Sequence, residues 1–257
     1  MKSKYKNILL TGASGQLGQA IVSSGIFPRL LIPAEAEFDI TNPDSIEKYF
    51  RQNEFDAVVH CAALARMSVC QEDPVKAIKT NIIGTSNLVN ALITKENKSK
   101  NNIRFVHIST DGVYSGTRGN YSKNSPTIPY NFYGWTKLGA ECAVNLLSNF
   151  CIIRTSFFIP EKIKFDCSAD NLYSSKVTVD YLVRAILMML NSDFTGVINV
   201  GGKRQSDYQR YKKFKPSLKR CKGIDISKDI NFRIAKDSSL NLRQWKKIEE
   251  RFKKIDA

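Results

Sequence analysis

Histidine is scarce in this sequence and paired cysteines are missing, which argues against a zinc site. The chain of 257 residues has 2 His and 6 Cys, and no two cysteines have the CxxC spacing typical of metal ligands. Several cysteines stand in apolar segments, where a free thiol behaves as a small hydrophobic group. We therefore expect reduced thiols and no bound metal; the cysteines are Cys61, Cys70, Cys142, Cys151, Cys167 and Cys221.

Long apolar runs are missing as well. A helix needs roughly 18 consecutive apolar residues to span a bilayer, whereas the most apolar stretch, residues 181–190, is short and interrupted by Arg184. Residues 1–12 contain only three consecutive aliphatic side chains, which is too few for a signal peptide. We therefore expect a cytoplasmic protein with no membrane partner.

Positive charge is plentiful but unevenly placed. The net charge is +15, and residues 201–257 contain 18 Lys/Arg against 7 Asp/Glu. Such a basic segment indicates contact with nucleic acid, a membrane surface or a phosphorylated small molecule, or simply a solvated lysine-rich face. The segment lacks the regular aromatic interleaving of a platform for single-stranded nucleic acid. We therefore expect no nucleic-acid partner.

Short aliphatic runs alternate with segments of helical periodicity over the first 200 residues. Strands are predicted at residues 6–11, 29–32, 57–61, 104–109, 151–154 and 197–200, and helices at 16–24, 43–52, 74–94, 132–147 and 177–190. Several strands are apolar on both faces, which predicts an α/β fold with a Rossmann-type, doubly wound parallel sheet. Residues 1–200 would form the domain built on this sheet, and residues 201–257 a small basic C-terminal lobe with one clear helix at 242–255.

A glycine-rich turn follows the first predicted strand directly. Gly12, Gly15 and Gly18 stand three residues apart between this strand and the first predicted helix. In that context Gly12 permits a tight turn, Gly15 lets the backbone approach a pyrophosphate, and Gly18 lets helix and strand pack closely. We predict a dinucleotide site on this loop, which includes Ser14. The end of the second strand, with Glu35 and Glu37, leaves the choice between NAD and NADP open.

A tyrosine and a lysine form the second chemical signal. Tyr133 and Lys137 are four residues apart and would share one helical face. A neighbouring ammonium stabilises a phenolate, so we expect the pKa of Tyr133 to lie well below its usual value of about 10. Thr110 follows an apolar strand at the carboxyl edge of the sheet, where a threonine and a tyrosine hydroxyl could hold a carbonyl oxygen together.

At this point the sequence resembles the extended short-chain dehydrogenases/reductases. The matching segments occur in the family's order: GASGQLG at 12–18, DIT at 39–41, HCAA at 60–63, NIIGT at 81–85, STDGVY at 109–114, YGWTK at 133–137 and IRTS at 153–156. They are most similar to the dTDP-4-dehydrorhamnose reductase branch, as is the segment AKDSSLN at 235–241. Two segments depart from the family pattern. The stretch between Arg154 and Lys176 is shorter than the family usually has, and residues 201–222 match no segment of the family.

The resemblance implies a role for individual residues. Thr110 would orient the substrate carbonyl with Asp111 nearby, Tyr133 would donate the proton, and Lys137 would bind the nicotinamide ribose. Phe157 would lie against the sugar. The residues implied to contact the cofactor are Gly12, Ser14, Gly15, Gln16, Leu17, Gly18, Asp39, Ile40, Ala62, Ala63, Leu64, Tyr133 and Lys137.

The resemblance implies that residues 1–200 form an NAD(P)-binding domain, with part of a substrate pocket at 155–176, and that the basic lobe at 201–257 binds substrate. It also implies an activity. The expected function is reduction of a nucleotide-linked 4-keto-6-deoxysugar, with hydride from NADH or NADPH, a proton from Tyr133 and no metal. The alternatives are an NAD-dependent epimerase or dehydratase of nucleotide sugars, or a non-catalytic nucleotide-binding regulatory subunit. A homodimer is a candidate assembly.

Overall fold

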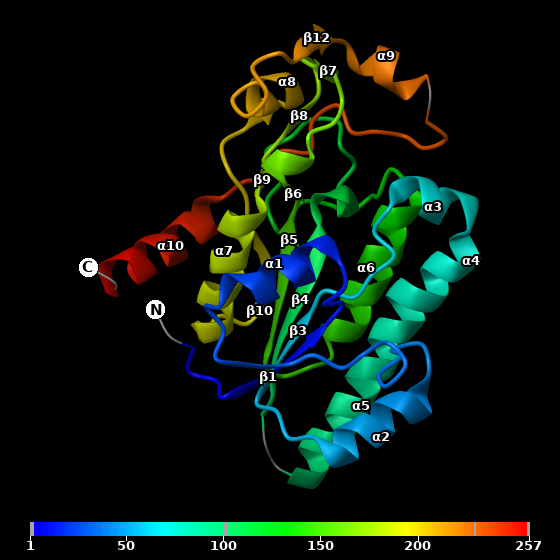
Figure 1. Ribbon diagram of the computed structural model, residues 1–257, viewed down its shortest axis with the longest axis vertical. Coiled ribbons are helices and arrows are strands. Elements are labelled where there is room, and N and C mark those ends of the chain that lie inside the picture. The colour runs from blue at the N-terminus through cyan, green and yellow to red at the C-terminus, as the bar shows by residue number, and fades with distance from the viewer. Residues whose placement is uncertain (1–2, 100–101, 229, 256–257) are drawn as a thin grey trace.

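A six-stranded parallel sheet forms the centre of this computed structural model, which describes residues 3–99, 102–228 and 230–255. In spatial order the strands are β10 (Gly196–Asn199), β5 (Phe150–Thr155), β4 (Arg104–Thr110), β3 (Ala57–His60), β1 (Asn7–Thr11) and β2 (Arg29–Leu31), as Figure 1 shows. The chain runs from β1 to β2 in one direction and returns to β3 on the other side of β1. Ligands bind at such a reversal, outside the carboxyl ends of the strands. The predicted doubly wound parallel sheet is confirmed.

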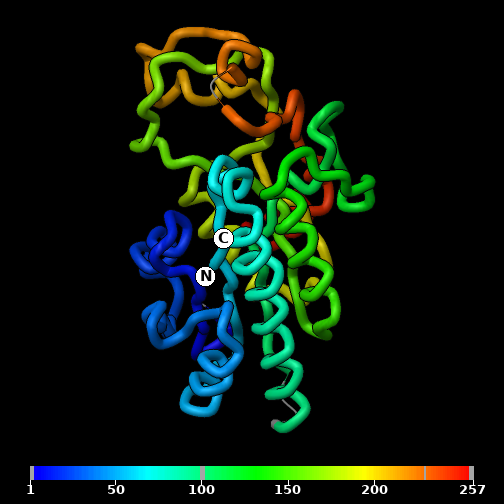
Figure 2. Tube along the Cα trace, turned by 90° about the vertical axis from the view of Figure 1, so that its right-hand side faces the viewer, coloured from blue at the N-terminus to red at the C-terminus, as the bar shows by residue number. Residues whose placement is uncertain are grey.

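Helices cover both faces of the sheet. One face carries α1 (Gln16–Ser24) and α7 (Val179–Asn191), and the other carries α2 (Pro43–Gln52), α5 (Gly84–Ser99) and α6 (Phe132–Val144) (Figures 1 and 2). Ile8 and Leu10 of β1 are buried against the first layer, whereas Leu9 between them is buried against the second. Each such fully buried side chain stabilises the fold by roughly 1.5–3 kcal/mol. This explains why the strands are apolar on both faces.

The long helix predicted at residues 74–94 is broken in the structure. Pro74–Ala77 form α4, Ile78–Ile83 form a π-helical turn, η1, and α5 begins only at Gly84. A short helix, α3 (Met67–Glu72), precedes them and was not predicted. The sequence pattern shows apolar periodicity but not the extra residue of a π-turn, a feature often found at functional sites.

A lobe of short elements caps the carboxyl edge of the sheet. Three small strand pairs build it: β6 (Phe157–Phe158) with β9 (Val177–Thr178), β7 (Cys167–Ala169) with β12 (Lys219–Cys221), and β8 (Tyr173–Ser174) with β11 (Gln205–Ser206). The helices α8 (Asp207–Tyr211) and α9 (Gly223–Ser227) complete it at the top of Figure 1. No local pattern predicted these elements, because each strand of two or three residues is stable only against a partner far along the chain.

The last helix, α10 (Arg243–Ile255), confirms the helix predicted at 242–255. It leaves the lobe and packs beside α7, where the buried Trp245 donates a hydrogen bond through Nε1 to the Tyr181 hydroxyl at 2.8 Å. The division of the chain at residue 200 stays a prediction. Among the residues described, we find no helix with the length and apolar character needed to cross a bilayer.

Candidate functional site

A cavity of about 910 Å³ opens at the carboxyl ends of β1, β2 and β3, where the strand order reverses. Four parts of the chain line it: the glycine loop after β1, the segment after β2, the segment after β3, and α4 with the start of η1. Residues that contribute include Gly12, Ser14, Gly15, Ile32, Glu35, Asp39, Ile40, Ala62, Ala63, Lys76 and Lys79. The cavity is therefore at the place in this fold where a dinucleotide is expected.

The glycine loop has the geometry of a pyrophosphate cradle. Gly12 has φ +73°, and a Cβ on it would stand 2.5 Å from the Ala62 nitrogen. A Cβ on Gly18 would stand 2.2 Å from the Gly12 carbonyl oxygen, so only glycine lets α1 pack this closely on the loop. Gly15 is the N-cap of α1 and provides no side chain to cap the first N–H groups. Those donors and the positive end of the helix dipole suit a bound phosphate.

Seven of the thirteen residues predicted to contact a cofactor line this cavity, and six do not: Gln16, Leu17, Gly18, Leu64, Tyr133 and Lys137. Gln16 is an exposed first residue of α1, and the side chain of Leu17 is buried in the core. Leu64 lies outside the lining, where its backbone N–H and C=O are both hydrogen-bonded to the Asn81 side chain, at 2.7 and 3.1 Å. Gly18 acts through packing, as described for the loop.

The lining of the cavity contains charges of both signs. The Asp39 carboxylate is already engaged, because Thr41 donates to it from its backbone N–H at 2.8 Å and from its hydroxyl at 3.0 Å. Glu35 lines the cavity on one side, and Lys76 and Lys79 line it from α4 and η1. A carboxylate suits the ribose hydroxyl of NAD and an ammonium suits the 2′-phosphate of NADP, so the choice between them stays open here.

Thr110 and Tyr133 meet beyond this cavity, at the carboxyl edge of β4. Thr110 ends β4 and is 6% exposed, and Tyr133 is the second residue of α6. The Thr110 side chain lies near enough to the Tyr133 phenol to influence its pKa. Lys137 is one helical turn further along α6 and is 2% exposed. The structure thus brings together the three residues predicted to handle the carbonyl and its proton.

The predicted effect of Lys137 on Tyr133 is wrong for this structure. Burial and the Asp111 carboxylate raise the pKa of Tyr133 above its usual value, and the nearby Thr110 side chain lowers it only in part. Lys137 is not among the groups that shift the Tyr133 pKa. Its own pKa is lowered by burial to about 8, against the opposing effect of the Glu141 carboxylate. Tyr133 is therefore held protonated, as a proton donor must be.

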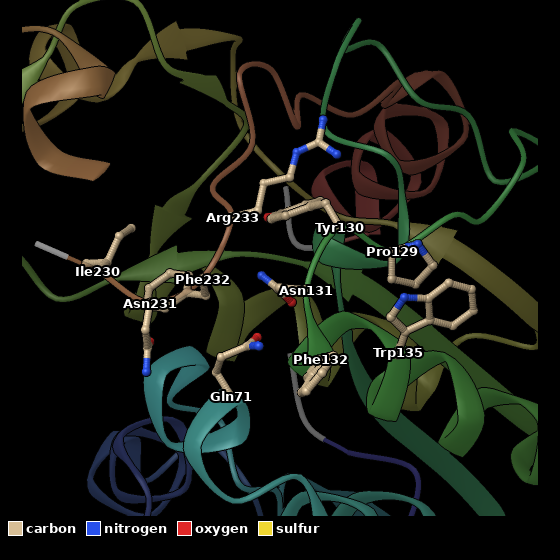
Figure 3. A pocket seen from close by; sticks show the side chains of 10 residues that line it. All are labelled: Gln71, Pro129, Tyr130, Asn131, Phe132, Trp135, Ile230, Asn231, Phe232 and Arg233. Atoms are coloured by element: carbon tan, nitrogen blue, oxygen red, sulfur yellow. The ribbon is translucent and has the colours of Figure 1, made fainter. Parts of the chain in front are cut away.

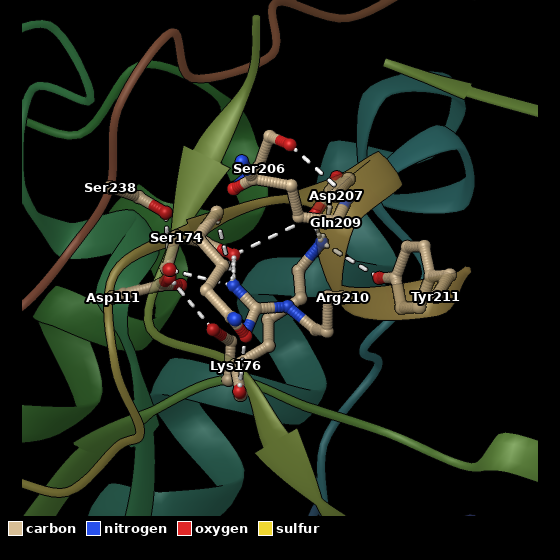
Figure 4. A network of polar contacts seen from close by, with 11 residues as sticks. Asp111, Ser174, Lys176, Ser206, Asp207, Gln209, Arg210, Tyr211 and Ser238 are labelled. Carbon is tan, nitrogen blue, oxygen red and sulfur yellow. Dashed lines mark hydrogen bonds and ion pairs between the residues drawn. The ribbon is translucent and has the colours of Figure 1, made fainter. Parts of the chain in front are cut away.

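Asp111 connects the edge of the sheet to the lobe through hydrogen bonds. Its Oδ2 accepts hydrogen bonds from the hydroxyls of Ser156 and Ser238, both at 2.8 Å, and its Oδ1 accepts one from Thr110 at 3.3 Å. Burial raises the pKa of this carboxyl, and the three hydroxyls lower it in part. Figure 4 shows Asp111 and Ser238 at the border of a larger polar network. We expected Asp111 to contact substrate, but its carboxylate is engaged by the protein's own hydroxyls.

The rest of that network belongs to the lobe. The Lys176 ammonium lies 3.2 Å from the Asp207 carboxylate and 3.3 Å from the Tyr211 hydroxyl. Arg210, which is 4% exposed, donates to the backbone carbonyls of Lys176 and Ser174 at 2.9 and 2.7 Å (Figure 4). These bonds hold α8 against β8 and fix the part of the lobe that faces Asp111.

Phe157, predicted to lie against the sugar, packs against the hydrophobic core under α7. Its neighbour Phe158 points into the lobe and makes edge-on contacts with Tyr211 and Phe214, at centroid distances of 5.2 and 5.4 Å. Successive residues of a strand point to opposite faces, so only one of the two phenylalanines can pack on the core. The contact of Phe157 with sugar stays a prediction.

A second cavity, of about 490 Å³, lies between the start of α6 and the lobe. Figure 3 shows the lobe segment 230–233 facing the first turn of α6 across it, with Gln71 of α3 below. Four aromatic rings, three side-chain amides and one guanidinium line it, from Tyr130, Phe132, Trp135, Phe232, Gln71, Asn131, Asn231 and Arg233. The sequence analysis missed this cavity. A phenylalanine and a tryptophan three residues apart at a helix start were its only local signal.

Asn81 was also missed as a functional candidate, although its segment carried part of the family resemblance. The π-turn η1 places it at 0% exposure. Besides holding Leu64, it donates a hydrogen bond through Nδ2 to the Thr136 hydroxyl at 2.8 Å. Asn81 thereby connects Leu64, in the segment after β3, to the residue before Lys137. A polar residue within an apolar helical pattern was the available signal.

A buried ion pair lies behind the catalytic candidates. The Glu141 carboxylate accepts hydrogen bonds from Arg154 of β5, the shortest at 2.6 Å, and from the Ser109 hydroxyl of β4 at 2.5 Å. Arg154 also donates to the Tyr114 hydroxyl at 2.9 Å, which in turn donates to Asn199 of β10 at 2.9 Å. This chain of bonds fixes α6, and with it Tyr133 and Lys137, on the strand that ends in Thr110.

Comparison with known proteins agrees with this geometry. A family described as the RmlD substrate binding domain matches residues 6–164. A dTDP-4-dehydrorhamnose reductase of Burkholderia thailandensis is 34% identical over 139 residues, which cover 53% of this chain and 45% of the relative. The chain spans less than half the length of the curated relatives it matches first.

Solved structures of the same class share the fold. The dTDP-4-dehydrorhamnose reductase of Clostridium acetobutylicum superposes with a TM-score of 0.81 at 24% identity, over 91% of this chain and 89% of the other. The enzyme of that name from Bacillus anthracis, in complex with NADP, superposes with a TM-score of 0.79 at 22% identity over 100% of both chains. The lobe is therefore part of the shared architecture.

Proposed function

The chain belongs to the RmlD substrate-binding domain family, and from this membership and the geometry of the site we propose that it is an NAD(P)H-dependent reductase of a nucleotide-linked 4-keto-6-deoxysugar. The observation that carries the proposal is the meeting of the Thr110 and Tyr133 hydroxyls at the sheet edge, with Lys137 buried one turn away. A relative named dTDP-4-dehydrorhamnose reductase supports this substrate class.

The cavity at the glycine loop suits NAD(P). Its volume, the Gly12 turn and the uncapped start of α1 fit a dinucleotide pyrophosphate. NADP is bound in the Bacillus anthracis structure of the same fold, which supports a cofactor of this class here. When bound, the reduced nicotinamide supplies a hydride to the carbonyl carbon.

The residues at the edge of β4 would then bind and protonate the oxygen of that carbonyl. The Thr110 and Tyr133 hydroxyls would donate hydrogen bonds to it and stabilise the negative charge that develops there. Tyr133 would transfer its proton to the oxygen. Its raised pKa keeps that proton on the phenol at neutral pH. Lys137, with a pKa of about 8, would hold the ribose of the nicotinamide and supply a positive charge near the phenolate that forms.

The cavity between α6 and the lobe would take the nucleotide part of the substrate. Its aromatic rings suit a base, its amides suit the polar edge of that base, and Arg233 suits a phosphate. It begins at Tyr130 to Phe132, directly before Tyr133, so a ligand there would reach the proton donor.

The experiment is a comparison of two matched variants. Tyr133→Phe removes one hydroxyl, and we expect kcat for NAD(P)H oxidation with a dTDP-linked 4-keto-6-deoxysugar to fall roughly 10²- to 10⁴-fold. Tyr208→Phe removes a hydroxyl from a second Tyr-x-x-x-Lys segment, which lies on α8, and should leave kcat unchanged. The melting temperature of each variant checks that it folds.

Two outcomes would contradict the proposal. Equal turnover of wild type and Tyr133→Phe would exclude Tyr133 as the proton donor. Conversion of a sugar nucleotide without net consumption of NAD(P)H, by protein that retains NAD⁺ through purification, would instead identify an epimerase or dehydratase.

A further inference from the structure

The cations of the basic C-terminal segment fall into two groups. Some of those in the lobe have acidic partners, such as Lys215 with Asp166 at 2.9 Å and Lys222 with Asp170 at 2.8 Å. Along α10, by contrast, Arg243, Lys247 and Arg251 form no salt bridge with any described residue, although each stands in a row at a spacing of four. This row accounts for positive charge that neither the fold nor the proposed reaction uses.

The row lines a cavity. About 400 Å³ of space lies at the start of α10, and Lys123, Arg243 and Lys247 all border it. The remaining lining is a serine hydroxyl and side-chain amides, such as those of Asn241 and Gln244, and it includes no carboxylate. α10 is 13 residues long and begins at Arg243, so the positive end of its dipole adds to the field of the three cations.

A second cavity, of about 630 Å³, continues along the same helix. Gln244 and Lys247 border both cavities, and the second is completed by Arg251 and by apolar groups that include Phe194 and Phe252. Its one acidic residue, Asp193, is neutralised by Lys4 at 2.7 Å. The two cavities together form a groove, here called the α10 groove, with a cationic end and a partly aromatic end.

We propose that the α10 groove is a ligand site separate from the cofactor cavity, and that its cationic end binds the phosphate group of a small molecule. Three cations, helix N–H groups and neutral amides are the donor set that suits a phosphate, and the absence of a carboxylate from the lining of the cationic end removes the repulsion that would oppose it. The apolar end would hold a non-polar part of the same molecule. The groove is concave, and a concave site favours a small molecule over a flat membrane surface.

The test uses inorganic pyrophosphate as the probe and isothermal titration calorimetry on the full chain. NADP⁺ is added first, because the glycine loop is another candidate phosphate site. We expect pyrophosphate to bind, and the double variant Arg243→Ala/Lys247→Ala to weaken binding at least tenfold, since hydrogen bonds from charged groups to phosphate are stronger than those from neutral groups.

A control variant on the same helix separates a site from overall charge. Lys246→Ala/Lys253→Ala also removes two positive charges, but from positions that border neither cavity. It should change the dissociation constant of pyrophosphate less than about twofold, through screened long-range effects alone. Equal weakening by both double variants would overturn the proposal. Absence of binding to wild type would also overturn it, as would competition by NADP⁺. Binding to vesicles of phosphatidylglycerol without binding to pyrophosphate would identify a membrane surface instead.

Discussion

The two halves of the candidate site are built in different ways. The cofactor half rests on one continuous loop, Gly12 to Gly18, whose backbone shape creates the cradle. The substrate half rests on side chains from distant segments, of which Asp111 and Ser238 are 127 residues apart and still joined by a hydrogen bond. A backbone-built site depends on local conformation, whereas a site built by side chains depends on how the lobe docks.

This difference predicts that the halves fail separately. A change in the glycine loop should remove dinucleotide binding from a protein that remains folded. A change in the buried bonds behind β4 and β5 should first cost stability, because those bonds hold the elements that carry the reacting groups. The predictions below test this separation from the largest expected effect to the smallest.

Loss of the buried ion pair should have the largest effect on stability. Arg154→Met keeps most of the side-chain volume but leaves the Glu141 carboxylate, 3% exposed, without its cation. Breaking a buried pair in this way costs about 3–5 kcal/mol. Arg51→Met breaks an exposed pair with Glu47 on α2 and should cost at most about 1 kcal/mol. Urea denaturation of both variants measures the two free energies of unfolding. Similar small losses would show that the pair does not hold the substrate half together.

Gly18→Ala should break the cofactor half. The added Cβ would lie 2.2 Å from the Gly12 carbonyl oxygen, so the loop must move away from the place where it meets a pyrophosphate. We expect NADP⁺ affinity to fall at least tenfold, or about 1.4 kcal/mol, in a chain that still unfolds cooperatively. Fluorescence titration with NADP⁺ measures this affinity in the variant and the wild type.

Gly25→Ala is the matched control for that change. Gly25 ends α1 with φ +63° and has open space around it, so alanine there should cost about 1–2 kcal/mol of stability through backbone strain and leave the affinity unchanged. Unchanged affinity in Gly18→Ala would mean that the cavity holds its ligand without the loop.

The same difference decides how much could be predicted from the sequence. The strands, α1, α2 and the glycine loop follow from local periodicity and spacing, and the structure has them within a few residues of the predicted bounds. Tyr133 and Lys137 share a helix, so their spacing of four was sufficient to place both on one face. The proximity of Thr110 followed from the edge at which parallel strands end.

What could not be predicted depends on contacts between distant segments. The lobe strands are too short to have a pattern of their own. The π-turn at Ile78–Ile83 interrupts a helix whose apolar periodicity continues through it. The Tyr133 pKa was predicted in the wrong direction because burial and Asp111, neither of them visible in a spacing, raise it, and the cation one turn away is not among the groups that shift it.

Ser238→Ala should have the smallest effect and is the most specific to the substrate half. It removes one of three hydroxyls that bind the buried Asp111 carboxylate, and Ser156 and Thr110 remain. We expect a loss of about 1 kcal/mol in the free energy of unfolding, the net contribution of one hydrogen bond, because two other hydroxyls still bind the carboxylate. If Ser238 docks the lobe, KM for the sugar nucleotide should rise while the affinity for NADP⁺ stays constant.

A double-mutant cycle with Ser156→Ala completes this test, because both hydroxyls bind the same carboxylate oxygen. Residues that share a partner couple by about 0.5–3 kcal/mol, whereas independent sites add within about 0.5 kcal/mol. Coupling in stability together with a change confined to KM for the sugar would support an anchor for the lobe at Asp111. Additive losses, or a parallel loss of NADP⁺ affinity, would show that the two halves are not separate and that Asp111 supports the whole edge of the sheet.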